Sequence, residues 1–270
     1  MENTLIRNNV KVSGKGTQSL IFAHGFGCDQ NMWRFVSPAF EEIIKLFCLI
    51  TSVLEKSDLN AYTPARLQQF VAATADDVIE ICDALNLRNT VFVGHSVSGM
   101  IGSLAAIERP DLFKNLIQLG PSPCYLNHPP DYLGGFERAD IEGLLDMIDK
   151  NYLGWARLFA PVVMKNNDRP ELSRELEASF CSTDPLIARR FAEATFYADN
   201  RADLPKIPTP SLIVQMTDDA VAPVAVGEFM QSRMPDSKLV LLEISGHCPH
   251  LSHPRETVEV IKNYLDSVEN

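Results

Sequence analysis

The sequence lacks the cysteine patterns of metal-bound and disulfide-bonded scaffolds. Its six cysteines stand singly at positions 28, 48, 82, 124, 181 and 248, with no C-x-x-C pair. This spacing argues against a structural zinc site and a disulfide framework, and it favours reduced thiols in a cytoplasmic protein. We therefore expect neither a resident metal nor a cofactor.

Long hydrophobic runs are also lacking. The longest nearly apolar stretch, IIKLFCLITSVL, covers residues 43–54 and contains Lys45. It is well short of the roughly 20 apolar residues that a membrane-spanning helix needs. The opening residues, MENTLIRNNV, show no basic segment followed by an apolar one, so we expect no secretion signal. The sequence predicts a soluble chain with no membrane partner.

Basic residues are scarce relative to acidic ones. The chain has 24 Lys and Arg against 35 Asp and Glu, a net charge of −11 at pH 7. Such a surface repels phosphate backbones, so we do not expect nucleic acid as a partner. The 270 residues are 46% hydrophobic, which is enough for one large domain with an inserted subdomain.

Short apolar segments alternate with helical patterns along most of the chain. The apolar segments are SLIFAHG (19–25), KLFCLIT (45–51), TVFVGHS (90–96), LIQLG (116–120), SLIVQMTDD (211–219) and KLVLLEISG (238–246). Helical patterns cover residues 65–87, 97–108, 224–233 and 255–267. Near-continuous apolar strands alternating with helices indicate a mostly parallel sheet with helices on both faces.

Residues 122–200 interrupt this alternation. They show no strand pattern, but helical patterns cover residues 138–151, 152–165, 170–181 and 184–197. Such a block between two strands predicts a helical lid inserted in a core made of residues 1–121 and 201–270. The cleft between a lid and the carboxyl ends of parallel strands is where ligands bind in open α/β folds.

Ser96 lies in a motif typical of a catalytic nucleophile. The segment VFVGHSVSGM places it between a predicted strand and a predicted helix, with Gly94 two residues earlier to permit a tight turn. The motif is G-x-S-x-S, whereas the usual nucleophile elbow is G-x-S-x-G. The alternative is an ordinary strand-to-helix turn in which Ser96 caps the helix. The strand and helix around the motif favour the elbow.

A serine nucleophile needs a base, and six histidines compete for that role. His247 follows the last predicted strand, and the chain order serine, acid, histidine is that of α/β hydrolases. Three other histidines are less suitable. His95 adjoins the serine, so its side chain should point away from it. His24 belongs to another turn, and His128 lies in the predicted lid. The cluster GHCPHLSH can also be interpreted as metal-binding, but Pro249 and the missing carboxylate oppose that.

The acid must come from a strand end between Ser96 and His247. The segment MTDDAVAP supplies two adjacent candidates, Asp218 and Asp219. Neighbouring side chains on an extended chain point in opposite directions, so only one of them can face the histidine. We prefer Asp219.

An oxyanion hole requires two backbone N–H groups directed at developing negative charge. Val97, directly after Ser96, is one candidate. The loop AHGFGCDQNMW supplies the other, because His24-Gly25 brings the backbone of Phe26 close. Taken alone, HGFG can be a simple glycine turn, but strand, elbow, acid and histidine occur here in the right order.

These segments resemble α/β hydrolases of the RsbQ type, bacterial stress-signalling hydrolases related to the plant karrikin and strigolactone receptors. The matching segments are HGFGCDQNMW, FVGHSVSGMIG, GPSPCYLNHPPDYLGGFE, NYLGWARLFAPVV, FCSTDP and GHCPHLSHP. The G-x-S-x-S variant is itself a feature of that group. The resemblance implies the α/β-hydrolase fold with an inserted four-helix lid. It also implies a triad of Ser96, Asp219 and His247, with oxyanion amides from Phe26 and Val97.

One segment departs from that family, which usually has an Asp and a Gly-rich turn after the second core strand. Here residues 48–58 are CLITSVLEKSD, with Ile50, Val53 and Glu55 where Asp and Gly are expected. The loss of glycines should change the conformation or the length of this turn near Lys56.

The resemblance also implies an aromatic ligand pocket. Six residues fall where similar receptors line their cavity with aromatics: Phe26, Tyr125, Phe136, Trp155, Phe159 and Phe196. Several of them can instead pack the lid helices together. None of these positions carries Lys or Arg, which favours a small, neutral, apolar ester or lactone over a charged substrate.

Two functions of different classes fit the sequence. In the first, Ser96 attacks a carbonyl carbon, His247 takes and returns the proton, and water releases the acyl group. In the second, implied by the RsbQ resemblance, slow hydrolysis or binding alone alters the docking of a protein partner such as a phosphatase. A meta-cleavage C–C hydrolase is a weaker alternative, because such enzymes usually need polar groups for a substrate carboxylate.

Overall fold

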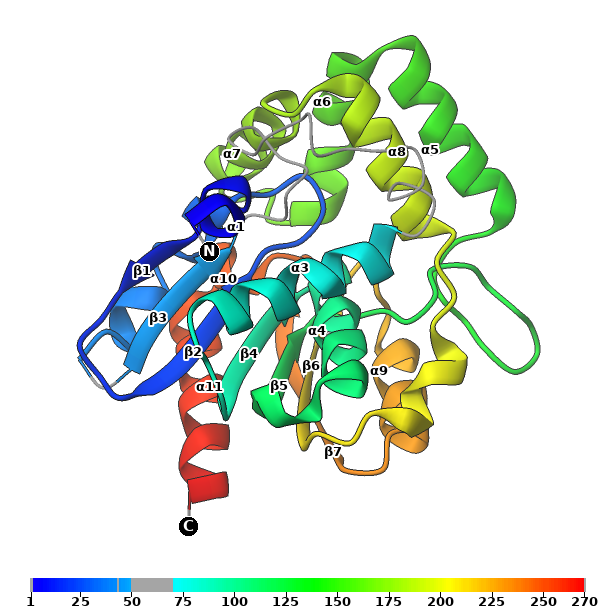
Figure 1. Ribbon diagram of the computed structural model, residues 1–270. Coiled ribbons are helices and arrows are strands. Elements are labelled where there is room, and N and C mark those ends of the chain that lie inside the picture. Colours follow the sequence, from blue (N-terminus) through cyan, green and yellow to red (C-terminus); the bar gives the residue numbers. More distant parts are fainter. Residues whose placement is uncertain (1, 43, 50–69, 270) are drawn as a thin grey trace.

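The protein is built on a sheet whose strands are almost all parallel. A computed structural model describes residues 2–42, 44–49 and 70–269. Within them, seven strands lie in the order β1-β3-β2-β4-β5-β6-β7 (Figure 1). Every neighbouring pair is parallel except β1 and β3. The strands are β1 (Lys11–Ser13), β2 (Gln18–Ala23), β3 (Ile44–Leu49), β4 (Thr90–His95), β5 (Phe113–Leu119), β6 (Ser211–Asp218) and β7 (Ser237–Ser245).

Helices cover both faces of this sheet (Figure 1). One face packs against α3 (Phe70–Ala84), α4 (Val97–Glu108) and α9 (Val224–Arg233). The other packs against α11 (Pro254–Glu269) and the turns η1 (Gln30–Trp33) and η2 (Ser37–Ala39). Shorter elements complete the described fold: α1 (Glu2–Arg7), η4 (Pro110–Leu112), η5 (Arg201–Lys206) and α10 (Pro249–Ser252).

Strand β2 shows why the core strands are apolar at nearly every position. Leu20 and Phe22 belong to the cluster on the α11 face, whereas Ile21 and Ala23 belong to the cluster on the α3 and α4 face. All four are buried. Successive side chains of a strand point to opposite faces, so a strand covered on both sides must be apolar throughout.

Four helices between β5 and β6 form a separate layer over the carboxyl ends of the strands (Figure 1). They are α5 (Arg138–Lys150), α6 (Tyr152–Met164), α7 (Pro170–Cys181) and α8 (Pro185–Phe196), and we call residues 138–196 the helical block. The block has its own apolar cluster, which includes Ile141, Ala156 and Leu176. Pro170 and Pro185 occupy the first turns of their helices, as predicted.

The predicted architecture, a mostly parallel sheet with helices on both faces and four inserted helices, is confirmed. Helices α4, α7 and α9 have the predicted bounds. Strand β1 was not predicted, because all three of its residues are exposed and carry no apolar pattern. The predicted helix over residues 65–87 corresponds to α3 where it is described, and residues 50–58 of the unusual turn lie outside the described residues.

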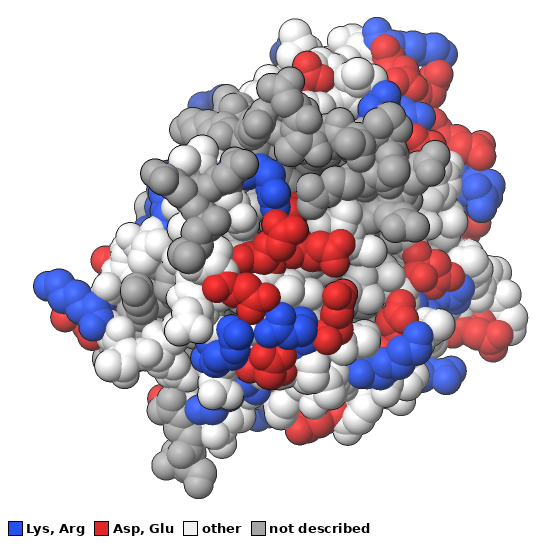
Figure 2. All heavy atoms as spheres, in the orientation of Figure 1, with Lys and Arg blue, Asp and Glu red and all other residues white. Residues whose placement is uncertain are grey.

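Charges of both signs are mixed on the face shown in Figure 2. Near α3 and α4, each of three arginines pairs with two acidic residues at 2.7 to 3.4 Å. The arginines are Arg7, Arg88 and Arg109. This pairing leaves a mixed rather than a basic surface there, which does not favour a polyanion. None of the described helices combines the length and the apolar character needed to cross a bilayer.

Three histidines are buried together near the carboxyl ends of β2 and β4. The ring centroids of His95 and His250 are 4.4 Å apart, and His250 lies 4.5 Å from the ring of Trp33. Burial lowers the pKa of His24, lowers that of His95 well below its usual value, and lowers that of His250 to about 3. For His95 and His250 the neighbouring histidines lower it further. All three rings are therefore neutral at pH 7.

We expect the free energy of unfolding to fall as the pH drops below 6.5. The unfolded chain then binds protons on these three histidines, whose ordinary pKa is 6.5, whereas the folded chain does not. The stabilisation is thus present above pH 6.5 and is lost toward lower pH. For His250, whose pKa is lowered to about 3, the loss between about pH 7 and about pH 5.5 is about 1 kcal/mol. Urea unfolding at the two pH values measures the total loss.

One variant separates the buried cluster from other titrating groups. His250→Phe keeps an aromatic ring beside Trp33 but removes one titrating group, so it should reduce the pH dependence by about 1 kcal/mol over this range. A pH dependence in His250→Phe equal to that of the wild type would show that His250 is not a neutral buried group.

Candidate active site

Ser96 sits at a strained turn between β4 and α4. Its backbone has φ of 57° and ψ of −125°, a left-handed conformation that non-glycine residues rarely adopt. A side chain on Gly94 would lie 2.5 Å from the carbonyl oxygen of Ser98, so this tight turn requires glycine there. The Ser96 side chain makes no capping hydrogen bond to α4. The structure therefore does not support the alternative in which the Ser96 side chain caps the helix.

The second serine of G-x-S-x-S fills a buried position behind the elbow. The Ser98 hydroxyl donates to the carbonyl oxygen of His24 at 2.5 Å and is completely buried. It thereby links the start of α4 to the loop after β2. The next residue, Gly99, packs so closely on Pro121 that a Cβ there would lie 2.9 Å from the proline side chain. Serine in place of the second glycine of G-x-S-x-G thus adds a hydrogen bond and leaves the tight turn intact.

Two hydrogen bonds connect Ser96, His247 and Asp219. His247 Nδ1 lies 2.7 Å from Asp219 Oδ2, and since a carboxylate only accepts, Nδ1 donates. His247 Nε2 lies 2.8 Å from Ser96 Oγ and is left as the acceptor of the serine proton. The Asp219 side chain is fully buried, and its Oδ1 accepts from the backbone N–H groups of Val221 and Ala222 at 2.7 and 3.2 Å. This arrangement can move a proton from Ser96 to His247 and stabilise the resulting imidazolium.

Asp218 points away from His247, as expected for its neighbour on an extended strand. It is exposed, accepts from Ser245 Oγ at 2.9 Å and pairs with Lys165. The hydrogen bond from Lys165 holds the pKa of the Asp218 carboxyl below its usual value, with a further contribution from Ser245.

The backbone of His247 is fixed from two sides. Its N–H donates to the carbonyl oxygen of Val163, near the end of α6, at 2.8 Å. Its carbonyl oxygen accepts from His95 Nε2 at 2.8 Å. His95, expected to point away from Ser96, thus holds the histidine loop instead. Both the sheet and the helical block position this side chain.

The two candidate oxyanion amides lie on elements next to Ser96. Val97 is the first residue of α4, where backbone N–H groups have no partner within the helix. Phe26 follows Gly25, and a Cβ on Gly25 would lie 3.0 Å from Ser96 Cβ. The loop after β2 therefore lies directly against the serine. Ser96, the start of α4 and the loop after β2 therefore lie together at the carboxyl edge of the sheet.

A narrow cavity opens on Ser96 and His247, between the strand ends and the helical block. The cavity volume is about 30 Å³. Four of the six expected aromatic residues line it: Phe26, Tyr125, Phe159 and Phe196. Among the described residues, no Lys or Arg contributes to its wall. Such a cavity suits a small neutral ligand.

Trp155 and Phe136 are not among the lining residues, which corrects the expectation for these two. Trp155 is buried one layer behind the wall, stacked on Phe159 with ring centroids 5.5 Å apart. Phe136 packs edge-on against Phe196 at 5.6 Å. Both pack against rings that form the wall. This is the alternative noted for these aromatics from the sequence, in which some of them pack the helices together.

The sequence prediction missed much of the wall. Missed lining residues come from the loop after β2, from β4, from α6 to α8 and from the loops after β6 and β7: Cys28, His95, Val163, Leu176, Phe180, Thr195, Val221 and Cys248. The spacing of Leu172, Leu176 and Phe180 marks the buried face of α7 and was available as a signal. Thr195 and the two cysteines carried no signal, because their side-chain types do not distinguish a cavity wall from a core.

Tyr125 and Cys248, two other lining groups, both have raised pKa values. Tyr125 lies 3.3 Å from Ser96 Oγ through its hydroxyl, and burial raises its pKa to about 12. A hydrogen bond with Cys28, together with burial, raises the pKa of the Cys248 thiol well above its usual value. A protonated thiol is a weak nucleophile. Ser96 is therefore the group in this cavity that is prepared for nucleophilic attack.

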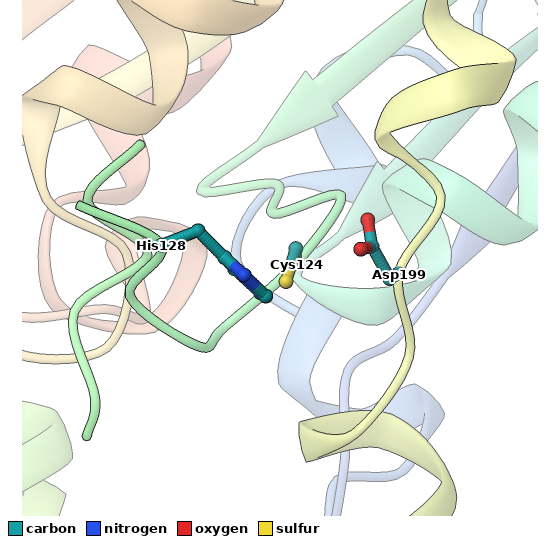
Figure 3. A group of neighbouring side chains, drawn as sticks. All are labelled: Cys124, His128 and Asp199. Carbon is teal, nitrogen blue, oxygen red and sulfur yellow. The ribbon is translucent and has the colours of Figure 1, made fainter. Parts of the chain in front are cut away.

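Cys124, His128 and Asp199 form a group with metal-ligand side chains outside the cavity (Figure 3). Their candidate ligand atoms lie within 4.8 Å of one another. However, Arg201 donates to both Asp199 carboxylate oxygens, at 2.8 and 2.6 Å. Burial also raises the pKa of the Cys124 thiol. Because a metal would have to displace the arginine and the thiol proton, the group is better explained as a link between the two chain segments that enter and leave the helical block.

Comparisons with known proteins agree with this geometry. A model described as the alpha/beta hydrolase family matches residues 20–260. The strigolactone esterase D14 of Arabidopsis thaliana is 35% identical over 269 residues, 97% of this chain and 98% of that protein. The karrikin insensitive 2 receptor CA of Petunia hybrida is 33% identical over 260 residues, 96% and 95% of the two chains.

A solved structure of a hydrolase from Oleispira antarctica superposes with a TM-score of 0.95. It shares 41% sequence identity and covers 98% of this chain and 97% of its own. Family match, relatives and structure agree over nearly the whole length. The chain therefore belongs to the alpha/beta hydrolase family and is related to the plant strigolactone and karrikin receptors.

Proposed function

We propose that the protein is a serine hydrolase for small, neutral esters or lactones. The observation that carries this proposal is the hydrogen-bonded series Ser96, His247 and Asp219 at the base of an apolar cavity. In this proposal Ser96 is the nucleophile, His247 the general base and acid, and Asp219 the acid of the triad.

In the first half of the reaction, His247 Nε2 accepts the Ser96 proton while Oγ attacks the carbonyl carbon. Negative charge then develops on the carbonyl oxygen, where the amides of Phe26 and Val97 would donate hydrogen bonds. Buried Asp219 stabilises the imidazolium through Nδ1. The turn at Ser96 supports this role, because it presents Oγ at the edge of the sheet rather than to the helix.

In the second half, the proton on His247 passes to the leaving oxygen and an acyl-serine remains. A water molecule, deprotonated by His247, attacks that acyl group and regenerates Ser96. For a lactone, the ring opens when the acyl-serine forms, and a hydroxy acid leaves after the attack by water. No step needs a metal, because the proton transfers and the oxyanion contacts all use groups of this chain.

We also propose that residues 122–200 act as a lid on a core of residues 1–121 and 201–270. The cavity wall supports this role, since α6, α7 and α8 contribute Phe159, Phe180 and Phe196 to it. A ligand must displace or pass between these rings to reach Ser96. The lid would thereby select ligands by size and exclude water from the reaction.

The second candidate function is ligand-dependent signalling of the RsbQ type, with slow turnover and a docked protein such as a phosphatase. Two observations favour keeping it. Receptors are among the relatives, and the lid is hydrogen-bonded to His247 through Val163, so a ligand that moves α6 would also move the catalytic histidine. A ligand can shift such an equilibrium only if it binds the two lid states with different affinity.

Ser96→Ala should abolish hydrolysis of p-nitrophenyl acetate, lowering kcat by several orders of magnitude, because triad members act as a unit. The melting temperature should change little, because replacing serine by alanine removes only a hydroxyl group and no large packing surface. The measurement is p-nitrophenol release with the folded variant. Retention of a tenth of the wild-type rate would exclude Ser96 as the nucleophile.

Asp219→Asn should lower kcat by about 10⁴, because the amide no longer holds His247 in the productive tautomer. Asp218→Asn is the matched control, at the last residue of β6 and directly before Asp219. Its exposed contacts with Lys165 and Ser245 contribute little, so activity should stay within about threefold of the wild type. The measurement is the steady-state kcat of both variants. A greater loss of kcat in Asp218→Asn than in Asp219→Asn would assign the acid to Asp218.

A neutral ester should bind Ser96→Ala without being consumed and raise its melting temperature by mass action. With phenyl acetate as the probe, adding Phe159→Ala should weaken this shift, because the ring lines the cavity. Adding Leu158→Ala, which changes the exposed neighbour on α6, should not. An equal shift in all three proteins would place the probe outside the cavity. Rapid multiple turnover by the wild type would favour the enzyme over the receptor.

A further inference from the structure

Among the described residues of the cavity wall, one side-chain hydroxyl has no hydrogen-bond partner. The Ser96 hydroxyl is hydrogen-bonded to His247, and the Tyr125 hydroxyl lies 3.3 Å from Ser96 Oγ. The two cysteine thiols of the wall are hydrogen-bonded to each other. Thr195 is different, because its hydroxyl oxygen is buried and has no hydrogen-bond partner among the described residues.

His95 is the other described lining residue with an unpartnered polar atom, but its geometry excludes a ligand contact. The unpartnered atom is Nδ1, and a Cβ on Gly25 would lie 2.7 Å from it. The backbone of the loop after β2 therefore covers His95 Nδ1. Thr195 stands beside Phe196 near the end of α8, where the helical block forms the cavity wall.

Leaving this hydroxyl without a partner is unfavourable. Thr195 is only 1% exposed, so bulk water does not reach it. A buried hydroxyl without a hydrogen bond destabilises a folded protein by about 1 to 3 kcal/mol, and valine would fill the same volume without that cost.

We propose that Thr195 is a specificity-determining residue whose hydroxyl binds a second oxygen of the substrate, apart from the carbonyl that Ser96 attacks. This inference rests on the proposed hydrolase function and names its substrate class. The substrate is a neutral ester or lactone that carries an additional ether, carbonyl or hydroxyl oxygen. A purely hydrocarbon acyl group would leave the hydroxyl unpaired.

The selectivity arises because the Thr195 hydroxyl stays unpaired when a ligand lacks the oxygen. It does not require an unusually strong hydrogen bond to a ligand that has one. A ligand oxygen supplies the hydrogen bond that the Thr195 hydroxyl lacks, whereas a methylene group at the same place does not. Sites that hydrogen-bond a substrate oxygen discriminate strongly against analogues that lack it. In this otherwise apolar wall, one hydroxyl is enough to distinguish an oxygen-bearing acyl chain from an alkyl chain of equal length.

The test compares three p-nitrophenyl esters of nearly equal size: the pentanoate, the ethoxyacetate and the 3-methoxypropanoate. In the two ethers an oxygen replaces one methylene group, at two different distances from the scissile carbonyl. The measured quantity is kcat/KM for each ether divided by kcat/KM for the pentanoate. Differences in intrinsic ester reactivity cancel when this ratio is compared between protein variants.

For at least one ether, Thr195→Val should lower the ratio about tenfold relative to the wild type, through loss of one hydrogen bond. Thr195→Ser keeps the hydroxyl and should keep the ratio within about threefold of the wild type. Thr195→Ala is a second hydroxyl-free variant if the valine protein does not fold. Unchanged ratios in the hydroxyl-free variants, or an equal loss in Thr195→Ser, would overturn the inference.

Failure of the proposed function gives a different result. If the folded wild type hydrolyses none of the three esters, the hydrolase proposal fails, and the role of Thr195 is then measured by binding. Melting temperatures of Ser96→Ala and of Ser96→Ala with Thr195→Val are compared with each ester. A larger shift with an ether than with the pentanoate, lost in the valine variant, upholds the oxygen contact, and equal shifts overturn it.

Discussion

The position of His247 is the constraint on which the rest of the site depends. Its Nδ1 and Nε2 lie at hydrogen-bond distance from Asp219 and Ser96, and its backbone is held by Val163 and His95. Each contact comes from a different element, so the imidazole is in place only when sheet, elbow and helical block are all assembled. Fixing a side chain in this way before the substrate binds is what makes proton transfer at Ser96 efficient.

This constraint explains features of the chain that are remote from the chemistry. Gly246 precedes the histidine with φ of 95°, and a Cβ there would lie 2.1 Å from the carbonyl oxygen of Met164. Only glycine allows the loop after β7 to approach the end of α6 so closely. Lys165 and Asn166 then join this end of α6 to Asp218 and Ser245. The helical block is thus fastened to the histidine loop, and enzyme and receptor functions would use the same connection.

Much of the fold and of the Ser96, His247 and Asp219 arrangement could be predicted from the sequence, because strong local patterns encode both. Doubly buried strands such as β2 and β4 must be apolar throughout, and the elbow needs Gly94 before Ser96. The wall of the cavity was predicted less well. Whether an aromatic ring such as Trp155 faces the cavity or supports another ring depends on the packing of α6 against α7, which no local pattern records.

The same limit applies to polar groups inside the wall. Thr195 is the penultimate residue of an amphipathic helix, and in the sequence it is indistinguishable from a threonine whose hydroxyl bonds to the preceding turn. Only the packed structure shows that its hydroxyl is buried, unpartnered and beside the cavity. Ser96, His247 and Asp219 are held by contacts that the fold requires. In the function proposed for Thr195, specificity would depend on the part of the site that the sequence predicts least.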